Sequence, residues 1–153
     1  MVIDGIIREM THHKAPFDHG GGLASKGIVS LKLLKEMMSH PFILKKPPKT
    51  SGREDFGKKY VLKLLKRSKA LRLGMEDLLT TATAFTAASL AENYRHFVFP
   101  KSMPEEIIFG GGGIHNKTLM RMIAAELPGI RIATYEDYGI PSDAAEAICF
   151  ALL

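Results

Sequence analysis

Four consecutive glycines, Gly110 to Gly113, stand between an apolar run and a helix-like pattern, and His115 and Asn116 follow them closely. Glycine loses more backbone entropy on folding than any other residue, so a run of four is costly unless the backbone itself is needed there. A strand that ends in glycines and leads into a helix is typical of a nucleotide site. The bare main chain admits the ligand, and the helix N-terminus offers free N–H groups. The alternative is a tight turn that lets a strand and a helix pack closely.

The glycine run does not match the two best-known phosphate-binding motifs. It lacks the Lys-Ser/Thr pair of the phosphate-binding loop, and no convincing Gly-x-Gly-x-x-Gly spacing with a distal acid surrounds it. Asn116 suits the N-cap of the following helix as well as it suits a nucleotide contact. His115 by itself does not indicate a metal. The residue types at this point leave a nucleotide site and a structural turn both open.

Other side chains that could do chemistry are spread along the chain. Arg53 and Glu54 follow a glycine in a proline-stiffened loop, where such a pair either fastens the loop to its neighbour or shapes a binding cleft. Glu146 lies one turn into the last predicted helix, where a carboxylate suits the helix dipole. The adjacent His12 and His13 would point about 100° apart on a helix, so they do not predict a shared metal ion. We therefore predict no metal site formed by side chains of this chain.

Length and composition indicate one globular domain. The chain has 153 residues, of which 46% are hydrophobic and 24% charged. A single cysteine, Cys149, excludes an internal disulfide framework and fits a reducing, cytoplasmic setting; its apolar neighbours predict a core thiol. No apolar run is long enough for a membrane span, and the first residues lack the basic leader of a signal peptide.

The net charge of +5 comes largely from residues 45–72. A solvated helix face with a loop explains such a segment, and a nucleic-acid surface is the alternative. Aromatic residues are not interleaved with these lysines as a base-stacking platform would require. We therefore predict neither a nucleic-acid partner nor a membrane partner.

The hydrophobic patterns predict a chain of helices with two short strands. The connection from strand through helix to strand predicts a right-handed parallel crossover. The Ala- and Thr-rich helix predicted over 75–99 should pack closely against another backbone. Because two parallel strands do not make a self-sufficient sheet, we expect the chain to be part of a larger fold. Helices are expected over 2–13, 30–40 with Ser30 as N-cap, 54–68, 75–99, 116–127 and from Ser142 onward, and strands over 105–110 and 130–136.

The order of the motifs resembles the C-terminal part of the anhydro-N-acetylmuramic acid kinase family. The family's Gly-Gly-Gly-x-His-Asn falls on Gly111–Gly113, His115 and Asn116. Its Thr-Gly-Arg-Glu appears here as Ser51-Gly52-Arg53-Glu54, and its closing acidic motif falls on Asp143 and Glu146. Segments similar to "FDHGGGLASKG" and "PPKTSGREDF" precede these motifs in the family order. One departure is Gly20, which stands where the family commonly has a second acid after Asp18.

The resemblance implies a fold and an activity. The family belongs to the sugar kinase, heat-shock and actin ATPase superfamily, so we expect an α/β fold: an incomplete actin-like, ribonuclease-H-like lobe, mostly helical with a small parallel sheet. The implied reaction uses ATP and Mg²⁺ to phosphorylate 1,6-anhydro-N-acetylmuramic acid at O6 while water opens the anhydro ring, giving N-acetylmuramic acid 6-phosphate for peptidoglycan recycling. It implies an adenosine site at Gly111, Gly112, Gly113, His115 and Asn116, and a sugar-side acid at Glu146.

The resemblance also implies that parts of the enzyme lie outside residues 1–153. In the family, an Asp-Thr-Gly-Pro-Gly-Asn segment precedes the stretch that Met1–Asp4 resembles. The resemblance implies that the aspartate of this segment is the general base. We expect 1–153 to be a C-terminal lobe fragment, without the N-terminal lobe, the first strands of this lobe or the phosphate hairpins. We also expect the chain alone to be inactive and to self-associate or pair with a missing N-terminal portion. The alternative is a non-catalytic helical interaction fragment that keeps only the shape of the lobe.

Overall fold

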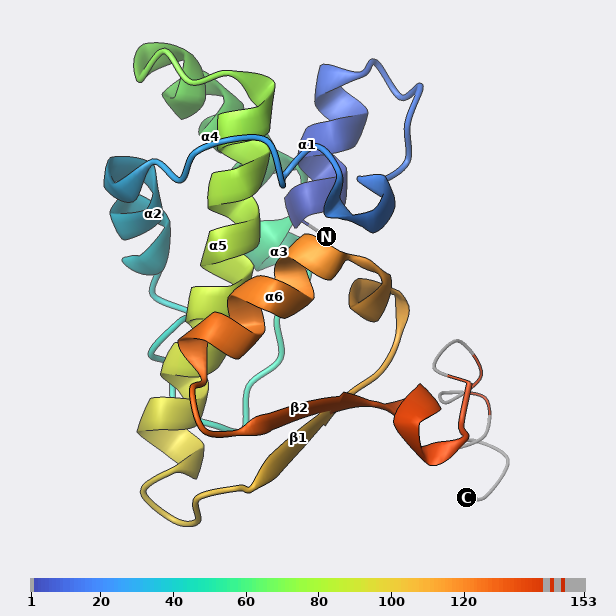
Figure 1. Cartoon of the computed structure of the whole chain (residues 1–153). Coiled ribbons are helices and arrows are strands. Elements are labelled where there is room, and N and C mark those ends of the chain that lie inside the picture. The colour runs from blue at the N-terminus through green and yellow to red at the C-terminus, as the bar shows by residue number, and fades with distance from the viewer. Residues whose placement is uncertain (1, 142–143, 145–146, 148–153) are drawn as a thin grey trace.

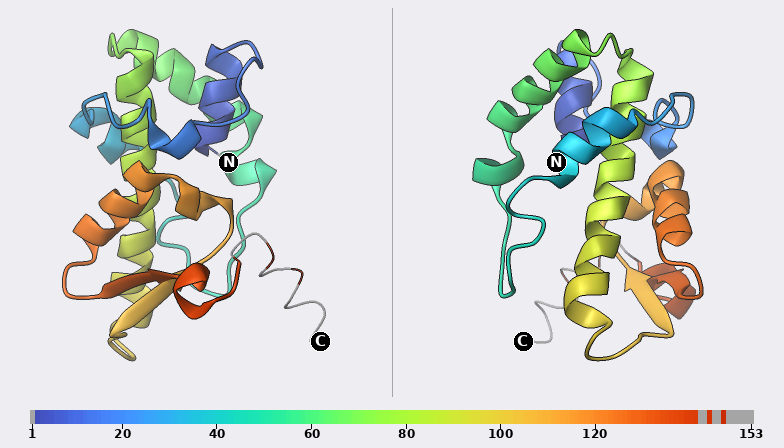
Figure 2. Two further views of the ribbon diagram at one scale, coloured as in Figure 1. Left: turned by 45° about the vertical axis from the view of Figure 1, so that its right-hand side comes forward. Right: turned by 90° about the vertical axis from the view of Figure 1, so that its left-hand side faces the viewer.

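The computed structural model of the chain describes residues 2–141, 144 and 147. Figure 1 shows the longest helix, α5, running through the molecule, with α1, α2 and α4 around its first half and the two strands near its end. In Figure 1 the helix α6 crosses in front of α5 between these two groups, and the right-hand view of Figure 2 shows α6 beside α5. The elements are α1 (Val2–Met10), α2 (Leu31–Met38), α3 (Arg53–Phe56), α4 (Lys58–Ala70), α5 (Met75–Asn93), β1 (Glu106–Phe109), α6 (Lys117–Glu126) and β2 (Arg131–Thr134), with short 3-10 turns at His19–Gly21, Gly112–His115 and Tyr135–Tyr138.

Every residue of the central helix α5 from Leu78 to Thr83 is buried, so the helix is enclosed on all sides there. Its threonine hydroxyls are satisfied within the helix, since Thr81 and Thr83 donate to the carbonyls of Asp77 and Leu79 at 2.7 and 2.8 Å. The backbone of Gly27 lies so close to α5 that a Cβ there would stand 2.3 Å from the carbonyl carbon of Glu76. This contact confirms the predicted close packing of the Ala- and Thr-rich helix against another backbone.

The hydrophobic core has two parts that share α5. The first part lies between α1, α2, α4 and the first half of α5, and includes the fully buried Ile6, Leu33 and Leu78. The second part lies between the end of α5, α6 and the strands, and includes Ala91 and Ile123. The cleft described below lies where these two parts meet.

The sheet consists of β1 and β2, which pair in parallel with Ile107 opposite Ile132 and Phe109 opposite Thr134. An ion pair of 3.0 Å between Arg131 and Glu106 joins the strands where they start. The helix α6 connects them. The predicted arrangement of a mostly helical chain with a small parallel sheet is therefore confirmed for the described residues.

Local signals located most of the helix starts correctly. Ser30 accepts a hydrogen bond from the Leu33 N–H at the start of α2, and Asn116 accepts one from the Leu119 N–H at the start of α6. The predicted helix over 75–99 ends as α5 at Asn93 and continues as a π-helical turn over Tyr94–Val98. The predicted final helix from Ser142, with Cys149, falls outside the described residues. None of the described helices is both long enough and apolar enough to cross a membrane.

The single helix predicted over 54–68 is wrong. The chain forms α3 and α4 instead, with Gly57 in an extended conformation between them. A Cβ at Gly57 would lie 2.1 Å from the carbonyl oxygen of Arg53, so the break needs a residue without a side chain. Phe56 and Tyr60 still lie on one side, with their ring centroids 5.2 Å apart, which explains why the apolar pattern continues across the break.

Candidate functional site

A cleft of about 570 Å³ lies where the two parts of the core meet. Segments far apart in the sequence form its walls: α1, the turn after Phe17, the loop at Ser51, the middle of α5 and the glycine-rich turn before α6. Its apolar floor includes the rings of Phe56 and Phe85, whose centroids are 5.9 Å apart. The predicted site residues that line this cleft are Gly112, Gly113, His115 and Asn116.

The glycine run turns the chain from β1 towards α6. A Cβ at Gly110 would stand 2.2 Å from the ring of Tyr135, so the ring lies directly against this exposed glycine. Gly111 has a φ of 74°, which is the left-handed region that glycine adopts without strain. A Cβ at Gly112 or Gly113 would meet nothing within 4 Å. The first half of the run therefore makes the turn, and the second half leaves bare backbone facing open space at the cleft.

A 3-10 turn over Gly112–His115 begins within the glycine run and ends just before α6. The strand β1 therefore does not lead directly into the helix. Asn116 then caps α6, with its Oδ1 2.9 Å from the Leu119 nitrogen. This oxygen is thereby engaged in the helix start, although Asn116 also lines the cleft. Ligand contact by Asn116 and His115 stays a prediction.

The start of α6 is fastened to the opposite wall of the cleft. Thr118 donates its hydroxyl hydrogen to the carbonyl of Gly21 over 2.9 Å, and both residues are buried. Gly21 has a φ of 72°, and a Cβ there would stand 2.1 Å from the side-chain oxygen of Asn116. The turn at His19–Gly21 and the glycine-rich turn are therefore held in a fixed relation.

Asp18 has a structural role in the same wall. It is 6% exposed, and its two carboxylate oxygens accept hydrogen bonds of 2.9 Å from the backbone of Leu23 and Ala24. These bonds fix the loop of 18–24 that leads to Gly21. The carboxylate serves to shape the cleft wall, although Asp18 also reaches the lining.

Arg53 and Glu54 are exposed at the start of α3 and are not among the lining residues of the cleft. The carboxylate of Glu54 folds back over Gly52, where a Cβ would meet it at 2.4 Å. Ser51, one residue before Gly52, does reach the cleft. The role of Arg53 and Glu54 in shaping the cleft stays a prediction, and Glu146 falls outside the described residues.

The loop that carries Ser51 is fixed by Lys49. Its ammonium group donates to the carbonyls of Phe42 and Ile43 over 3.1 and 2.8 Å. It also lies 5.0 and 5.1 Å from the ring centroids of Phe42 and Phe97. Burial lowers the pKa of Lys49, with a smaller contribution from the nearby charge of Lys45. This lysine acts as a clamp within the basic segment rather than as part of a solvated face.

The charged residues of the cleft wall on α1 were missed in the sequence. Asp4 and Arg8 are four residues apart, so they lie on one face of the helix, and both line the cleft. The Arg8 Nε donates to the carbonyl of Pro16 over 3.1 Å, which ties α1 to the loop before Phe17. The spacing of Asp4 and Arg8 was visible in the sequence, but only the packing of α1 against α5 turns that face towards the cleft.

Known proteins resemble the chain over its whole length. A sequence model of the family described as "Anhydro-N-acetylmuramic acid kinase" matches residues 1–153. The chain is 46% identical over 153 residues to the anhydro-N-acetylmuramic acid kinase of Caldanaerobacter subterraneus subsp. tengcongensis. It is 42% identical over 155 residues to that of Bacillus cereus strain ZK / E33L, and 39% identical over 153 residues to that of Clostridioides difficile strain 630.

These similarities cover 100% of this chain but 39%, 40% and 39% of the three relatives. The chain thus spans about two fifths of the length of the curated relatives that it matches. The match to the family model includes every motif that lines the cleft. The chain belongs to the anhydro-N-acetylmuramic acid kinase family.

Proposed function

We propose that the chain forms part of a kinase that transfers the γ-phosphoryl group of ATP to O6 of 1,6-anhydro-N-acetylmuramic acid, with hydrolytic opening of the anhydro ring. The product would be N-acetylmuramic acid 6-phosphate. The observation that carries this proposal is the open space in front of Gly112 and Gly113 at the cleft. A side chain at either position would project into the space that an adenosine needs.

In this proposal the chain contributes the adenosine side of the active site. The backbone of Gly112 and Gly113 would lie flush against the base and ribose, and the aromatic floor at Phe56 and Phe85 gives the base an apolar surface. The start of α6 adds the partial positive charge of a helix N-terminus. Binding here would fix the direction of the phosphates, and this positioning is the main part of phosphoryl-transfer catalysis.

We also propose that the chain is one part of an actin-like lobe. Two parallel strands with helices packed around them fit one end of such a lobe. We propose that residues 1–153 are its C-terminal portion, and that further strands, the phosphate hairpins and the general base belong to sequence that the longer relatives have beyond the matched segment. Glu146 would act on the sugar side as a carboxylate that holds hydroxyls or assists ring opening.

ATP would carry Mg²⁺ on its phosphates, where the ion neutralises charge that develops during transfer. The described residues contain no group of three or more His, Cys, Asp or Glu side chains that could hold a metal.

Isothermal titration with ATP, with and without the anhydro sugar, tests the proposal. We expect weak binding of ATP by the chain, no phosphoryl transfer by the chain alone, and transfer once it is combined with the N-terminal portion of a relative. Phosphoryl transfer by the 153 residues alone would contradict the division of the active site proposed here. Absence of nucleotide binding in the combined protein would contradict the kinase assignment.

A second candidate is a non-catalytic interaction module that keeps only the shape of the lobe. Exposed apolar side chains such as Ile28, Leu31 and Met103, which are 79%, 77% and 64% exposed, would give it surfaces for self-association or for a missing N-terminal portion. Sedimentation should then show a dimer or larger species. A monomer at all concentrations would contradict this candidate.

A further inference from the structure

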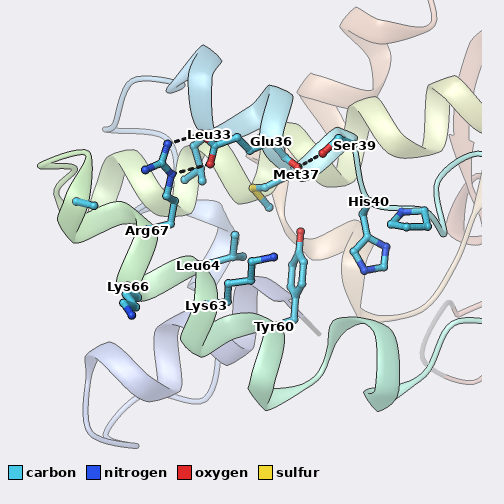
Figure 3. Close-up of a pocket in the computed structure, with 12 residues that line it drawn as sticks. Leu33, Glu36, Met37, Ser39, His40, Tyr60, Lys63, Leu64, Lys66 and Arg67 are labelled. Carbon is cyan, nitrogen blue, oxygen red and sulfur yellow. Dashed lines mark hydrogen bonds and ion pairs between the residues drawn. The ribbon is translucent and has the colours of Figure 1, made fainter.

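A second hollow, of about 560 Å³, lies between α2 and α4, and Figure 3 shows the side chains around it. It shares no lining residue with the cleft. Leu33 and Met37 of α2 and Leu64 of α4, which are 1%, 2% and 5% exposed, form its floor, and the exposed Pro41 and Ala70 also line it. We call this hollow the α2–α4 groove. Its volume falls within the range of about 300–1,000 Å³ that is typical of small-molecule sites.

The wall of the α2–α4 groove contains a polar atom whose hydrogen-bonding capacity is unused. The hydroxyl oxygen of Tyr60 is buried and has no hydrogen-bond partner among the described residues. Burial raises the pKa of Tyr60 to about 12, so the phenol keeps its proton and remains a donor at neutral pH. Leaving such a group unpaired costs about 1–3 kcal/mol. An acceptor supplied by a ligand would remove that cost.

The ring of Tyr60 has a fixed position. Its centroid lies 5.2 Å from that of Phe56 and 5.5 Å from that of His40, both with nearly perpendicular rings. The Nδ1 of His40 accepts a hydrogen bond from the Phe42 N–H over 3.3 Å, so Nε2 is the nitrogen of the neutral ring that carries a proton. His40 also lines the groove. The ring of Tyr60 is therefore held in place at the wall of the groove by these two neighbouring rings.

The rim of the α2–α4 groove is positively charged. Lys63 and Lys66 line it and make no ion pair among the described residues, whereas Arg67 is paired with Glu36 through a hydrogen bond of 2.7 Å. The hydrogen bond from Arg67, and then the charges of Arg67, Lys32 and Lys63, lower the pKa of Glu36, so this carboxylate stays ionised. On α4, Lys63 is a surface neighbour of both Tyr60 and Lys66, because it lies three residues from each; Tyr60 and Lys66 themselves lie about 120° apart around the helix.

We propose that the α2–α4 groove binds a small organic anion that has an apolar body and one acidic group. The apolar body lies over the floor of the groove and against the exposed Pro41 and Ala70, where it replaces water on an apolar surface. The acidic group meets the ammonium groups of Lys63 and Lys66 and accepts the free hydrogen of the Tyr60 hydroxyl. This site is independent of the nucleotide cleft, and the two are separated by the contact between Phe56 and Tyr60.

Titration of the full chain with 8-anilinonaphthalene-1-sulfonate, followed by fluorescence, tests the charge requirement. Its neutral counterpart N-phenyl-1-naphthylamine has the same apolar body without the acid. We expect the sulfonate to bind about tenfold more tightly than the neutral compound, and octanoate to displace it but octanol not. Equal affinity for the charged and neutral compounds would overturn the proposal.

Matched variants locate the binding. Lys63→Gln combined with Lys66→Gln should weaken sulfonate binding about tenfold, whereas Lys59→Gln combined with Lys69→Gln should leave it unchanged. The control pair lies on the same helix, is exposed and is outside the groove lining. Equal losses in both double variants would show binding to the general basic surface and would overturn the proposal.

The methyl resonance of Met37 gives a readout that does not depend on these lysines. It should shift on addition of the sulfonate and remain unchanged on addition of ATP, because Met37 lines the groove but not the cleft. Its assignment follows from a Met37→Leu variant, which conserves volume. A Met37 methyl that does not respond to saturating sulfonate would contradict the proposed site.

Discussion

The cleft and the α2–α4 groove have similar volumes, about 570 and 560 Å³, but different walls. The cleft lies where the two parts of the core meet, and backbone without side chains at Gly112 and Gly113 forms part of its wall. The groove lies beside the first part of the core and is bounded by side chains from two helices. A backbone wall has no side chain that could change rotamer to make room. A single added methyl group should therefore disturb the cleft far more than it would disturb the groove.

The largest effect is expected for Gly21→Ala at the fixed side of the cleft. The new methyl group would stand 2.1 Å from the Asn116 oxygen, and the residue would keep a φ of 72°. Strain and overpacking together should lower the free energy of unfolding by about 3 kcal/mol. Urea denaturation measures this loss.

Gly20→Ala is the matched control for Gly21→Ala. Gly20 has a φ of 62°, but a Cβ there would meet nothing within 4 Å. Only the cost of the left-handed conformation, about 1 kcal/mol, should remain. Equal losses in the two variants would show that the contact between the turn at His19–Gly21 and α6 does not set the geometry of the cleft.

A smaller effect is expected where the glycine run leaves β1. A Cβ at Gly110 would stand 2.2 Å from the ring of Tyr135, which can move at some cost. Gly110→Ala should lower the free energy of unfolding by about 1–2 kcal/mol. Combining it with Tyr135→Ala should restore most of that difference in a double-mutant cycle. If the two changes in the free energy of unfolding are fully additive, the proposed close contact between Gly110 and this ring is contradicted.

Asn116→Ala separates the capping role of Asn116 from ligand contact. Loss of the hydrogen bond to the Leu119 N–H should lower the free energy of unfolding by about 1 kcal/mol. Asn116→Asp should keep this stability because aspartate is an equally good N-cap. If Asn116→Asp weakens binding of uncharged adenosine while stability is unchanged, the side chain contacts the nucleoside. Unchanged stability in Asn116→Ala would contradict the capping role.

The smallest effect is expected in the groove, at Tyr60→Phe. This change removes an unpaired hydroxyl, so stability at pH 7 should stay the same or rise by up to about 1 kcal/mol. The fold raises the pKa of Tyr60 from its ordinary value of 10.0 to about 12, so the unfolded chain loses this proton first as the pH increases. Stability should therefore fall between about pH 10 and 12 in the native chain.

The free energy of unfolding of the native chain and of the Tyr60→Phe variant, measured against pH, checks this expectation. The alkaline fall should be smaller in Tyr60→Phe than in the native chain. An identical alkaline fall in Tyr60→Phe and the native chain would contradict the burial of this phenol.

Elements with their own local signals could be predicted from the sequence. Ser30 and Asn116 marked two helix starts because a polar cap precedes an apolar pattern, and both strands followed from short apolar runs next to turn residues. The break at Gly57 could not be predicted in this way, because Phe56 and Tyr60 continue the apolar stripe across it. The close approach of the Arg53 carbonyl exists only in the folded chain.

The candidate site could be predicted only in part for the same reason. The residues Gly112, Gly113, His115 and Asn116 are contiguous, so the sequence pointed to them together. Asp4, Arg8 and Phe85 reach the cleft through packing of α1 against α5, which no local pattern encodes. The α2–α4 groove likewise depends on the packing of two helices whose patterns indicate only which face is buried.

Titration of the isotopically labelled chain with adenosine and with ATP, followed through its backbone amide resonances, tests the central claim most directly. If the bare backbone at the cleft receives a nucleotide, the amide signals of Gly112 and Gly113 shift with both ligands, and Gly112→Val abolishes the shifts without lowering stability, because a side chain there meets open space. If these amides do not respond while the native chain binds the nucleotide elsewhere, or if Gly112→Val binds as tightly as the native chain, the glycine run is a structural turn and the claim is wrong.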